Sequence, residues 1–300
     1  MDRSPPSAAN APSASGGADA GRALRKARFV SLRDFESGRI AKELGVEFLP
    51  TLDTAFLYTP IVQVPKDVME QIGDGEYYVI VPNYLVSQPK YSKIHSSPLQ
   101  VRLFFTELAE RILKQFPDVK LVFLPQLFCG ANYAESDYSF FKDIKEELDD
   151  DRIVVLPDTL SSEYHQAVIA GSKCVVGARY HSIVFAINNC VPFVAMSYEN
   201  RLVGLLQSVD KQDRLVDITL ALDPPKGRKR LSESKVTDLR SGSLTFEAEV
   251  ALARILDKMT VLERDEKATE GAKFMTSQCF DILVDILKDS ESRKKTRSRR

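Results

Sequence analysis

The chain has 300 residues, of which 44% are hydrophobic and 28% are charged, and its formal net charge is −1 at pH 7. This length suffices for one large domain or two ordinary ones with a buried core. The near-zero charge argues against a general role in binding nucleic acids or membrane surfaces. The sequence contains no run of about 18 apolar residues, so no membrane span is predicted.

The first segment, residues 1–22, is rich in Ser, Ala, Gly and Pro. Such a composition buries too little apolar surface to order itself, which predicts a disordered leader. The segment also lacks the apolar stretch of a secretory signal, and a cytoplasmic protein is expected on that ground.

The four cysteines are Cys129, Cys174, Cys190 and Cys279, and they form no CxxC pair and no pair at metal-ligand spacing. In apolar runs a free cysteine behaves as a small hydrophobic residue. This usage is typical of a reducing, intracellular setting and predicts no structural metal site.

Regular patterns begin near residue 27. The runs ARFVSL (27–32) and VEFLP (46–50) predict two short strands. Between them, Phe35 to Leu44 have helical spacing, with Gly45 as the expected C-cap. Residues 60–75 have no clear period and are predicted to be a connection.

Apolar runs and helical patterns then alternate strictly. The predicted strands are YYVIV (77–81), VKLVFLP (119–125), RIVVLP (152–157), KCVVGA (173–178) and VPFVAM (191–196). The predicted helices are 99–116, 137–148, 161–170 and 181–188. This alternation predicts an α/β fold with a Rossmann-like, doubly wound parallel sheet. Ligands of such sheets bind beyond the carboxyl ends of the strands.

The pattern weakens after residue 210. Residues 224–242 predict a polar, basic loop, and two amphipathic helices are expected over 246–262 and 272–287. The chain ends in the basic run RKKTRSRR.

The strongest candidate site is Gly177-Ala178-Arg179-Tyr180-His181-Ser182, where a predicted strand runs into a helix. Such a turn presents unpaired N–H groups and the positive end of the helix dipole to an anion. Arg179 adds a planar fork that can hold two oxygens, and His181 suits proton transfer near neutral pH. Alternatively, Arg179 forms a surface salt bridge and His181 bonds to backbone.

A second strand-end segment is Ser197-Tyr198-Glu199-Asn200-Arg201, in which Arg201 is expected to add a second positive charge to the same edge of the sheet. The alternative is that Tyr198 packs and that Glu199 pairs with Arg201 in solvent.

Three weaker candidates also follow predicted strands. Arg33 precedes Asp34, which is expected to cap the next helix. Gln126 lies in a strand-end loop that either contacts a ligand or is only a turn. Ser161 and Ser162 begin a helix, most simply as an N-cap, although spare N–H groups there also suit a ligand.

The segment GARYHSIVFAINNCVPFVAMSYENR (177–201) resembles the carboxy-terminal signature of the polysaccharide pyruvyl transferase family. That signature has Arg-x-His at a strand end, a small apolar helix, a Val-Pro strand and Tyr-x-x-Lys before a Gly-Leu-Leu-like helix, matched here by residues 204–206. VSLRDFESGRIAKELGVEFLPTLDTAFL (30–57) and LPDTLSSEYHQAVIAGSKCVVGARYH (156–181) resemble two further stretches of the family, in family order.

The resemblance implies a GT-B-like protein of two Rossmann-like domains with the active site between them. It implies phosphoenolpyruvate as the donor substrate, with no other cofactor, and a sugar of a polysaccharide or glycan as the acceptor. The pyruvyl group is transferred to two hydroxyls as a ketal, with release of phosphate. Arg179 then matches an anion clamp and His181 a clamp or proton donor. Arg33 matches an arginine that reaches the donor from the other domain.

This sequence departs from the family pattern in two ways. Arg201 stands where the family usually has lysine, and the two are not geometrically equivalent. The family pattern also begins well upstream of residue 28, so residues 23–60 are expected to be a remnant of the first domain, with a partner chain as one source of the rest. The expected divisions are 1–22 leader, 23–60 remnant, 61–222 donor-binding domain, 223–245 linker, 246–290 helices and 291–300 basic tail.

Two other functions stay open at this point. One is a truncated or non-catalytic relative that keeps an anion-binding fold. The other is a GT-B glycosyltransferase that uses a nucleotide sugar and places an acidic residue, such as Glu199, on the ribose.

Overall fold

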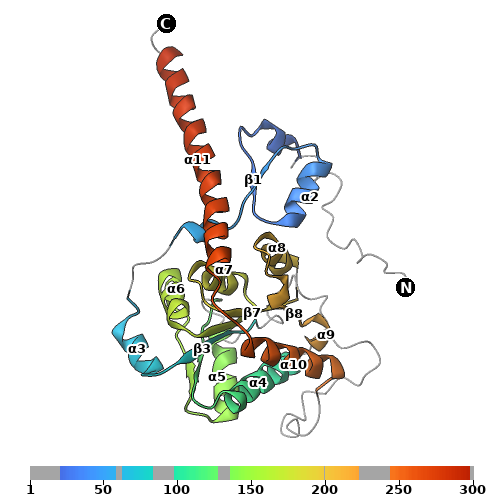
Figure 1. Ribbon diagram of the computed structural model, residues 1–300, viewed down its shortest axis with the longest axis vertical. Helices are drawn as coiled ribbons and strands as arrows, with labels where there is room; N and C mark the ends of the chain where they lie inside the picture. The colour runs from blue at the N-terminus through green and yellow to red at the C-terminus, as the bar shows by residue number, and fades with distance from the viewer. Residues whose placement is uncertain are drawn as a thin grey trace, which may run out of the picture. The chain divides into compact units, whose positions relative to one another are not determined.

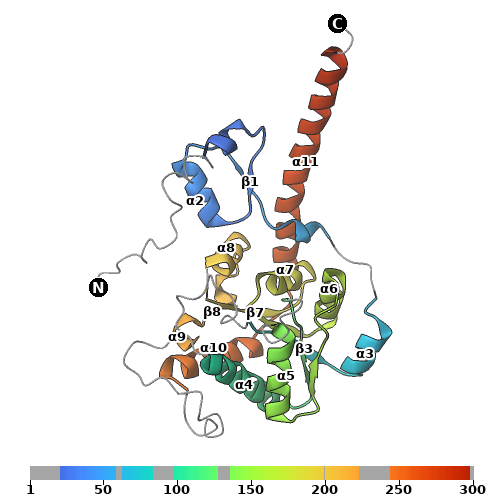
Figure 2. The same ribbon diagram turned by 180° about the vertical axis from the view of Figure 1, so that it is seen from behind.

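The computed structural model describes residues 21–58, 63–83, 98–127, 136–198, 200–222 and 244–297, with backbone alone at 98–99, 200 and 291–297. The predicted leader up to residue 20, and the predicted linker up to residue 243, therefore lie outside the described residues. The chain divides into two compact units, a larger one of residues 54–274 and a smaller one of residues 1–53 and 275–300. Figures 1 and 2 show the ribbon from opposite sides.

The larger unit is built on a six-stranded sheet in the order β5-β4-β3-β6-β7-β8, and every neighbouring pair is parallel. Its strands are β3 (Tyr77–Val81), β4 (Lys120–Phe123), β5 (Ile153–Val155), β6 (Cys174–Gly177), β7 (Phe193–Ser197) and β8 (Leu215–Asp217). This order confirms the predicted Rossmann-like, doubly wound sheet. The direction of winding reverses between β3 and β6, which is where such sheets bind ligands.

Helices cover both faces of this sheet (Figures 1 and 2). On one side lie α4 (Pro98–Gln115), α5 (Asp137–Leu148) and α10 (Phe246–Thr260), and on the other α6 (Ser162–Gly171) and α7 (Tyr180–Asn188). The remaining elements of this unit are η1 (Thr54–Leu57), α3 (Lys66–Ile72), α8 (Asn200–Ser208), η5 (Gln212–Arg214) and α9 (Thr219–Leu222). The last helix, α11, runs from Glu266 to Arg297.

The main core lies between the sheet and the α4, α5 and α10 side. Alternate strand residues such as Ile80, Phe123 and Val176 pack there with Phe105 and Phe141, all nearly inaccessible to solvent. Side chains alternate between the faces of a strand, so neighbouring strand residues face α6 and α7 instead. Because both faces of the sheet are packed, the backbone position at each strand end is fixed. The residues that directly follow the strands are therefore placed at defined positions along the edge of the sheet.

The smaller unit contains the predicted strand-helix-strand. Strand β1 (Ser31–Leu32) pairs in parallel with β2 (Leu49–Pro50), and α2 (Phe35–Glu43) connects them. Asp34 caps α2, because its carboxylate accepts a hydrogen bond of 2.7 Å from the Ser37 amide. Gly45 follows the helix with φ of 64°, a left-handed conformation that favours glycine. The predicted N-cap is confirmed, whereas the C-cap residue is Leu44 and the expected Gly45 comes directly after it.

Two expectations about irregular segments are wrong. Residues 60–75 were expected to form a connection, yet they contain α3, whose Val68 and Ile72 are buried. This helix has only seven residues, too few to show a helical period in the sequence. Beyond residue 210, β8 adds a sixth strand of three residues, in which only Val216 is buried.

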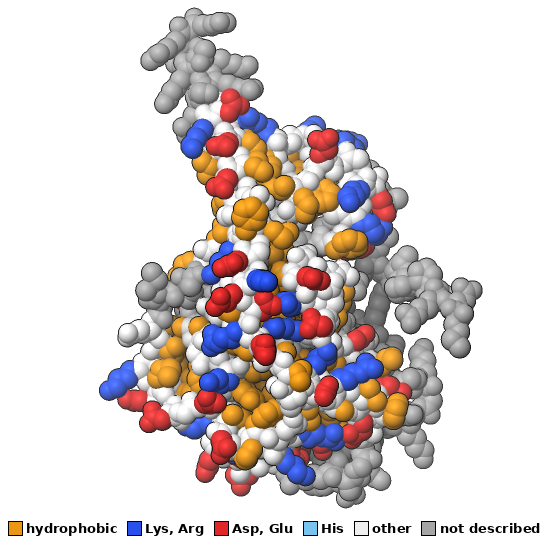
Figure 3. Space-filling view, viewed as in Figure 1, with side chains coloured by type: hydrophobic (Ala, Val, Ile, Leu, Met, Phe, Trp, Pro, Cys, Tyr) orange, Lys and Arg blue, Asp and Glu red, His pale blue; other side chains and the backbone are white. Residues whose placement is uncertain are grey.

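The described part of the chain includes no helix with the length and hydropathy needed to cross a bilayer. It also includes no group of three or more His, Cys, Asp or Glu side chains placed to hold a metal ion. On the face seen in Figure 3, acidic and basic side chains are interspersed rather than gathered by sign.

Candidate functional site

A cavity of about 660 Å³ opens in the larger unit, lined by residues from the carboxyl ends of its central strands. Asn83 follows β3, Gln126 follows β4, Arg179 follows β6 and Tyr198 follows β7, and all four line it. The segment around η1 and the first turns of α6 contribute further lining residues. The cavity therefore spans the point where the winding of the sheet reverses, as the fold class predicts.

Arg179 is held by a buried carboxylate. Asp137, the first residue of α5, is fully buried and accepts hydrogen bonds from Arg179 at 2.5 Å and from the backbone amides of Gln126 and Leu127 at 3.1 and 3.0 Å. Burial raises the pKa of Asp137, while the Arg179 guanidinium and the two amides act to lower it. The alternative of a surface salt bridge for Arg179 is replaced by a buried ion pair, which leaves the Nε of Arg179 without a hydrogen-bond partner.

His181 lines the same cavity as Arg179, two residues further along the chain. Its ring lies edge-on to Tyr180, with centroids 5.4 Å apart, and 5.9 Å from the ring of Phe185. Arg179 is the N-cap residue of α7 and its side chain makes no capping bond. The structure therefore brings a guanidinium, an imidazole and a helix N-terminus to one cavity, as the sequence predicts.

Gly177 and Ser182 lie behind the cavity rather than in its lining. Ser182 is buried and its hydroxyl donates a hydrogen bond of 2.6 Å to the carbonyl oxygen of Arg179. A Cβ atom at Gly177 would lie only 2.2 Å from the Ser182 hydroxyl oxygen. The two residues shape the turn that presents Arg179.

Gly177→Ala is expected to lower the free energy of unfolding by about 1–3 kcal/mol, because the new methyl group overlaps the Ser182 hydroxyl in a packed core. Adding Ser182→Ala should recover part of this loss, since it removes the closest overlapping atom. Urea unfolding of the two variants and the parent measures both effects. Equal stability of Gly177→Ala and the parent would contradict the packing argument.

The segment after β7 contributes Tyr198 and Arg201 to the lining. The side-chain amide of Asn83 donates a hydrogen bond to the Tyr198 hydroxyl, and the Oδ1 atom of Asn83 is buried without a partner. Arg201 is exposed and makes no ion pair with any described residue. Glu199 lies outside the described residues and only the backbone of Asn200 is described, so the predicted roles of these two residues stay predictions.

Of the weaker candidates from the sequence, some line the cavity and others do not. Gln126 lines the cavity and its Nε2 atom is buried without a partner. Ser162 lines the cavity, whereas Ser161 is the N-cap of α6, where its hydroxyl accepts a hydrogen bond of 3.4 Å from the Tyr164 amide. Arg33 belongs to the smaller unit and pairs there with Asp53, so its predicted reach to the donor stays a prediction.

Sequence reasoning missed several lining residues, of which His165 is the most informative. Its side chain is 9% exposed, and its Nε2 atom is buried without a partner. Burial lowers the pKa of His165 to about 4, so its imidazole is neutral at pH 7. A signal was available, because His165 and Gln166 are polar residues at buried positions of a short helix that begins at a predicted strand end.

The lining is strongly biased in charge. The described lining residues include two arginines, Arg179 and Arg201, and none is Asp or Glu; His165 also lines the cavity but is neutral at pH 7. Two donor atoms of the lining, Gln126 Nε2 and Arg179 Nε, are buried without a partner, which costs desolvation energy that an acceptor would relieve, whereas the unpaired Asn83 Oδ1 calls for a donor. Such a lining suits an anion.

Fold and cavity together define a Rossmann-like α/β protein with a cavity lined by basic and neutral polar side chains at the switch point of its sheet. The family model described as polysaccharide pyruvyl transferase matches residues 13–200, which is more than half of the chain. The chain belongs to the polysaccharide pyruvyl transferase family, and thus to a family of transferases.

Solved structures with low identity share the fold. A structure described as a UDP-N-acetylglucosamine 2-epimerase from Listeria monocytogenes is 13% identical with a TM-score of 0.51, and the match covers 89% of this chain and 60% of that one. At this identity the likeness shows the fold alone, in agreement with the predicted Rossmann-like half of a GT-B-like protein. The chain therefore spans less than two thirds of the length of that relative.

Two further matches have lower TM-scores. The C-terminal domain of a group 1 glycosyltransferase from Francisella tularensis is 14% identical with a TM-score of 0.38, over 77% of this chain and 97% of that one. A UDP-forming trehalose-phosphate synthase from Burkholderia xenovorans is 11% identical with a TM-score of 0.41, over 81% and 52%.

Proposed function

We propose that this chain binds phosphoenolpyruvate in the cavity at the switch point and transfers its pyruvyl group to two hydroxyls of a glycan sugar. The observation that supports this most is the lining, which combines Arg179, Arg201 and His181 with no described carboxylate. Membership of the polysaccharide pyruvyl transferase family is consistent with it.

The donor's chemistry matches these side chains. Phosphoenolpyruvate carries a phosphate and a carboxylate, and guanidinium groups bind both through paired hydrogen bonds. Asp137 holds the Arg179 guanidinium in place, and the side chain lines the cavity with its Nε still without a partner. The amides at the start of α7 favour negative charge at the same position.

Ketal formation requires proton transfer at the donor's methylene carbon. In the proposed reaction His181 protonates this carbon, which leaves an oxocarbenium-like centre at the neighbouring carbon. One sugar hydroxyl adds to this centre, phosphate departs, and the second hydroxyl closes the ketal. Of the two hydroxyl protons, one replaces the proton given by His181 and the other leaves with phosphate.

The test uses calorimetric titration with phosphoenolpyruvate. The parent should bind, and Arg201→Gln should weaken binding roughly tenfold or more, because a hydrogen-bonded charge pair is lost. Arg201 is exposed and makes no described ion pair, so its removal should leave stability unchanged. Arg254→Gln, an exposed position on α10 that does not line the cavity, is the matched control and should bind like the parent.

Arg179 needs a different design because its removal leaves the buried Asp137 without a counter-ion. The double variant Asp137→Asn, Arg179→Met removes both charges together and should bind no phosphoenolpyruvate while remaining folded. If the parent fails to bind, the proposed donor binding is wrong, and if this double variant binds as well as the parent, the donor site is elsewhere.

Measuring phosphate release separates the remaining functions. Binding without phosphate release on any glycan would support a non-catalytic relative. Tighter binding of UDP than of phosphoenolpyruvate would support a glycosyltransferase that uses a nucleotide sugar. A cytoplasmic location and a partner chain that supplies a first domain stay predictions.

A further inference from the structure

The cavity is larger than the proposed donor requires. Phosphoenolpyruvate has about ten non-hydrogen atoms, and even at the roughly 30 Å³ that a water molecule occupies in the liquid it would fill about 300 Å³. The cavity measures about 660 Å³, so close to half of it is left for a second molecule.

The residues of the cavity are divided by chemistry. Arg179, His181 and Arg201 come from the segments after β6 and β7. The lining residues from η1, from Tyr58 just after it and from α6 carry no formal charge at pH 7. We call four of them the neutral subsite: Tyr58, Ser162, His165 and Gln166. The neutral subsite contains no guanidinium group that could bind a second anion.

Hydrogen-bonding groups of the neutral subsite are free to meet a ligand. The Nε2 atom of His165 is buried without a partner on a side chain that is nine-tenths inaccessible. The Gln166 Oε1 atom accepts a 3.0 Å hydrogen bond from Asn188, and no described residue accepts one from the Gln166 side-chain NH₂ group. An orphaned buried polar atom is costly unless something binds it, so the subsite is suited to hydroxyls.

The neutral subsite is also rigidly built. The Asn188 side chain donates to the carbonyl oxygens of Ala55 and Tyr58 at 3.1 and 2.6 Å as well as to Gln166. The Tyr58 hydroxyl donates to Glu163 at 3.1 Å, which fixes the orientation of its half-exposed ring. An aromatic ring beside fixed amide and imidazole groups is a surface for a flat, hydroxylated molecule.

We infer that the neutral subsite binds the acceptor, an uncharged hexose ring that stacks on Tyr58 and directs hydroxyls to His165 and Gln166. This inference rests on the proposed function, because a second substrate with hydroxyls is what pyruvyl transfer requires. An acidic sugar is excluded from this half by the lack of a cation, and the reacting hydroxyls then face the donor held by Arg179 and Arg201.

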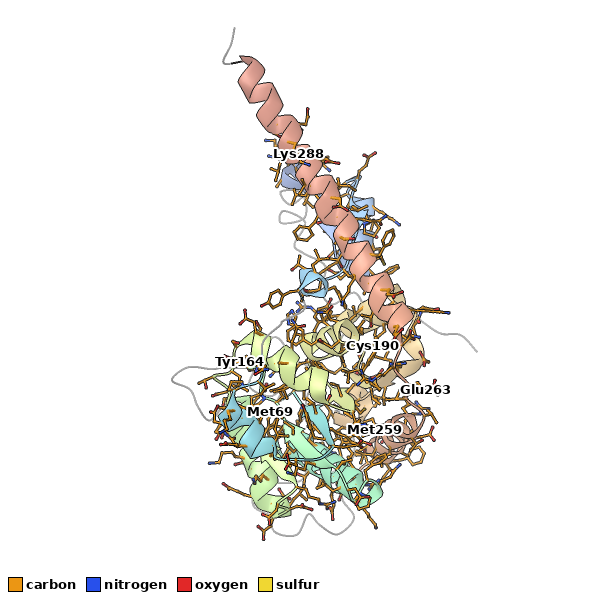
Figure 4. The ribbon with its side chains drawn as sticks, turned by 60° about the vertical axis from the view of Figure 1, so that its left-hand side comes forward. Met69, Tyr164, Cys190, Met259, Glu263 and Lys288 are labelled. Carbon is orange, nitrogen blue, oxygen red and sulfur yellow. The ribbon has the colours of Figure 1, made fainter. Side chains whose placement is uncertain are left out.

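The test is saturation-transfer NMR of the whole chain with the methyl glycosides of glucose, galactose and mannose, each alone and with phosphoenolpyruvate. At least one should receive saturation from the parent. His165→Leu should reduce its affinity at least tenfold, and Gln166→Leu should also weaken it. Tyr164→Phe, on the same helix and outside the cavity lining, should leave it unchanged (Figure 4).

Folding of each variant is checked by circular dichroism and by its affinity for phosphoenolpyruvate. His165→Leu should change that affinity less than about threefold, because the proposed donor contacts of Arg179 and Arg201 are unchanged. Binding of the same glycoside by His165→Leu and the parent would overturn the inference, as would no binding of any glycoside by the parent. If His165→Leu instead loses phosphoenolpyruvate, the two halves are one site and the inference is wrong. Failure of the parent to bind phosphoenolpyruvate, with glycoside binding intact, would overturn only the proposed donor.

Discussion

Asp137→Ala is expected to lower the free energy of unfolding by about 3–5 kcal/mol and to abolish phosphoenolpyruvate binding. Removing one partner of a buried ion pair leaves the other charge without compensation, which carries a cost of about this size. Here Arg179 would lose its carboxylate, and the amides of Gln126 and Leu127 would lose their acceptor. Without this support the guanidinium is no longer held toward the cavity.

The matched control is Asp143→Ala, on the same helix. Asp143 pairs with Arg102 at 3.4 Å, but its side chain is 49% exposed, so its loss should cost less than about 1 kcal/mol. Guanidinium chloride unfolding gives the stabilities, and calorimetry gives the binding. Asp137→Asn, Arg179→Met should recover most of the lost stability without recovering binding. Equal costs for Asp137→Ala and Asp143→Ala would show that the buried pair contributes little.

The stability of the larger unit is expected to fall in mild acid because of His165. Its pKa is lowered by burial to about 4, against an ordinary value of 6.5. The unfolded chain therefore binds a proton at this residue that the folded chain does not, so stability is present above pH 6.5 and is lost as the pH falls toward 4. Between pH 7 and pH 5 this linkage amounts to about 2 kcal/mol.

His165→Leu isolates this contribution from that of the carboxylates. Urea unfolding of the parent and the variant at pH 7 and pH 5 should show that the parent loses about 2 kcal/mol more than the variant does. Because a buried, unpartnered polar atom is also removed, the variant should be at least as stable as the parent at pH 7. Parallel losses in the two proteins would mean that the imidazole is solvated and that its pKa is not lowered.

Most of the sheet was predictable from the sequence, because its central strands are buried on both faces. Such strands appear as continuous apolar runs, and YYVIV became β3 with the predicted bounds. The elements that were missed are short or weakly buried. Helix α3 has only two buried residues, and β8 has one, so neither leaves a periodic signal in the sequence.

The candidate site was predictable only in part. Arg179 and His181 were found because they directly follow a predicted strand. A residue at that position can be assigned to the carboxyl edge of the sheet from the sequence alone. Asp137 was not recognised as part of the site, because it precedes Arg179 by 42 residues and resembles an ordinary acidic residue in the first turn of a helix. His165 was missed because a polar residue at an inward position of a helix marks a buried side chain but does not show whether that side chain has a hydrogen-bond partner.

By itself, the sequence of this protein determined the alternation of strands and helices, the edge of the sheet that carries the polar side chains, and the family. These follow from local patterns, since burial on both faces and strand-end turns each require particular residues within a few positions. Only the tertiary structure decided that Arg179 is paired with a buried carboxylate and that neutral polar residues of α6 line the same cavity. Those features depend on side chains from distant segments meeting in one desolvated place, where the energy of a charge is set by its neighbours in space.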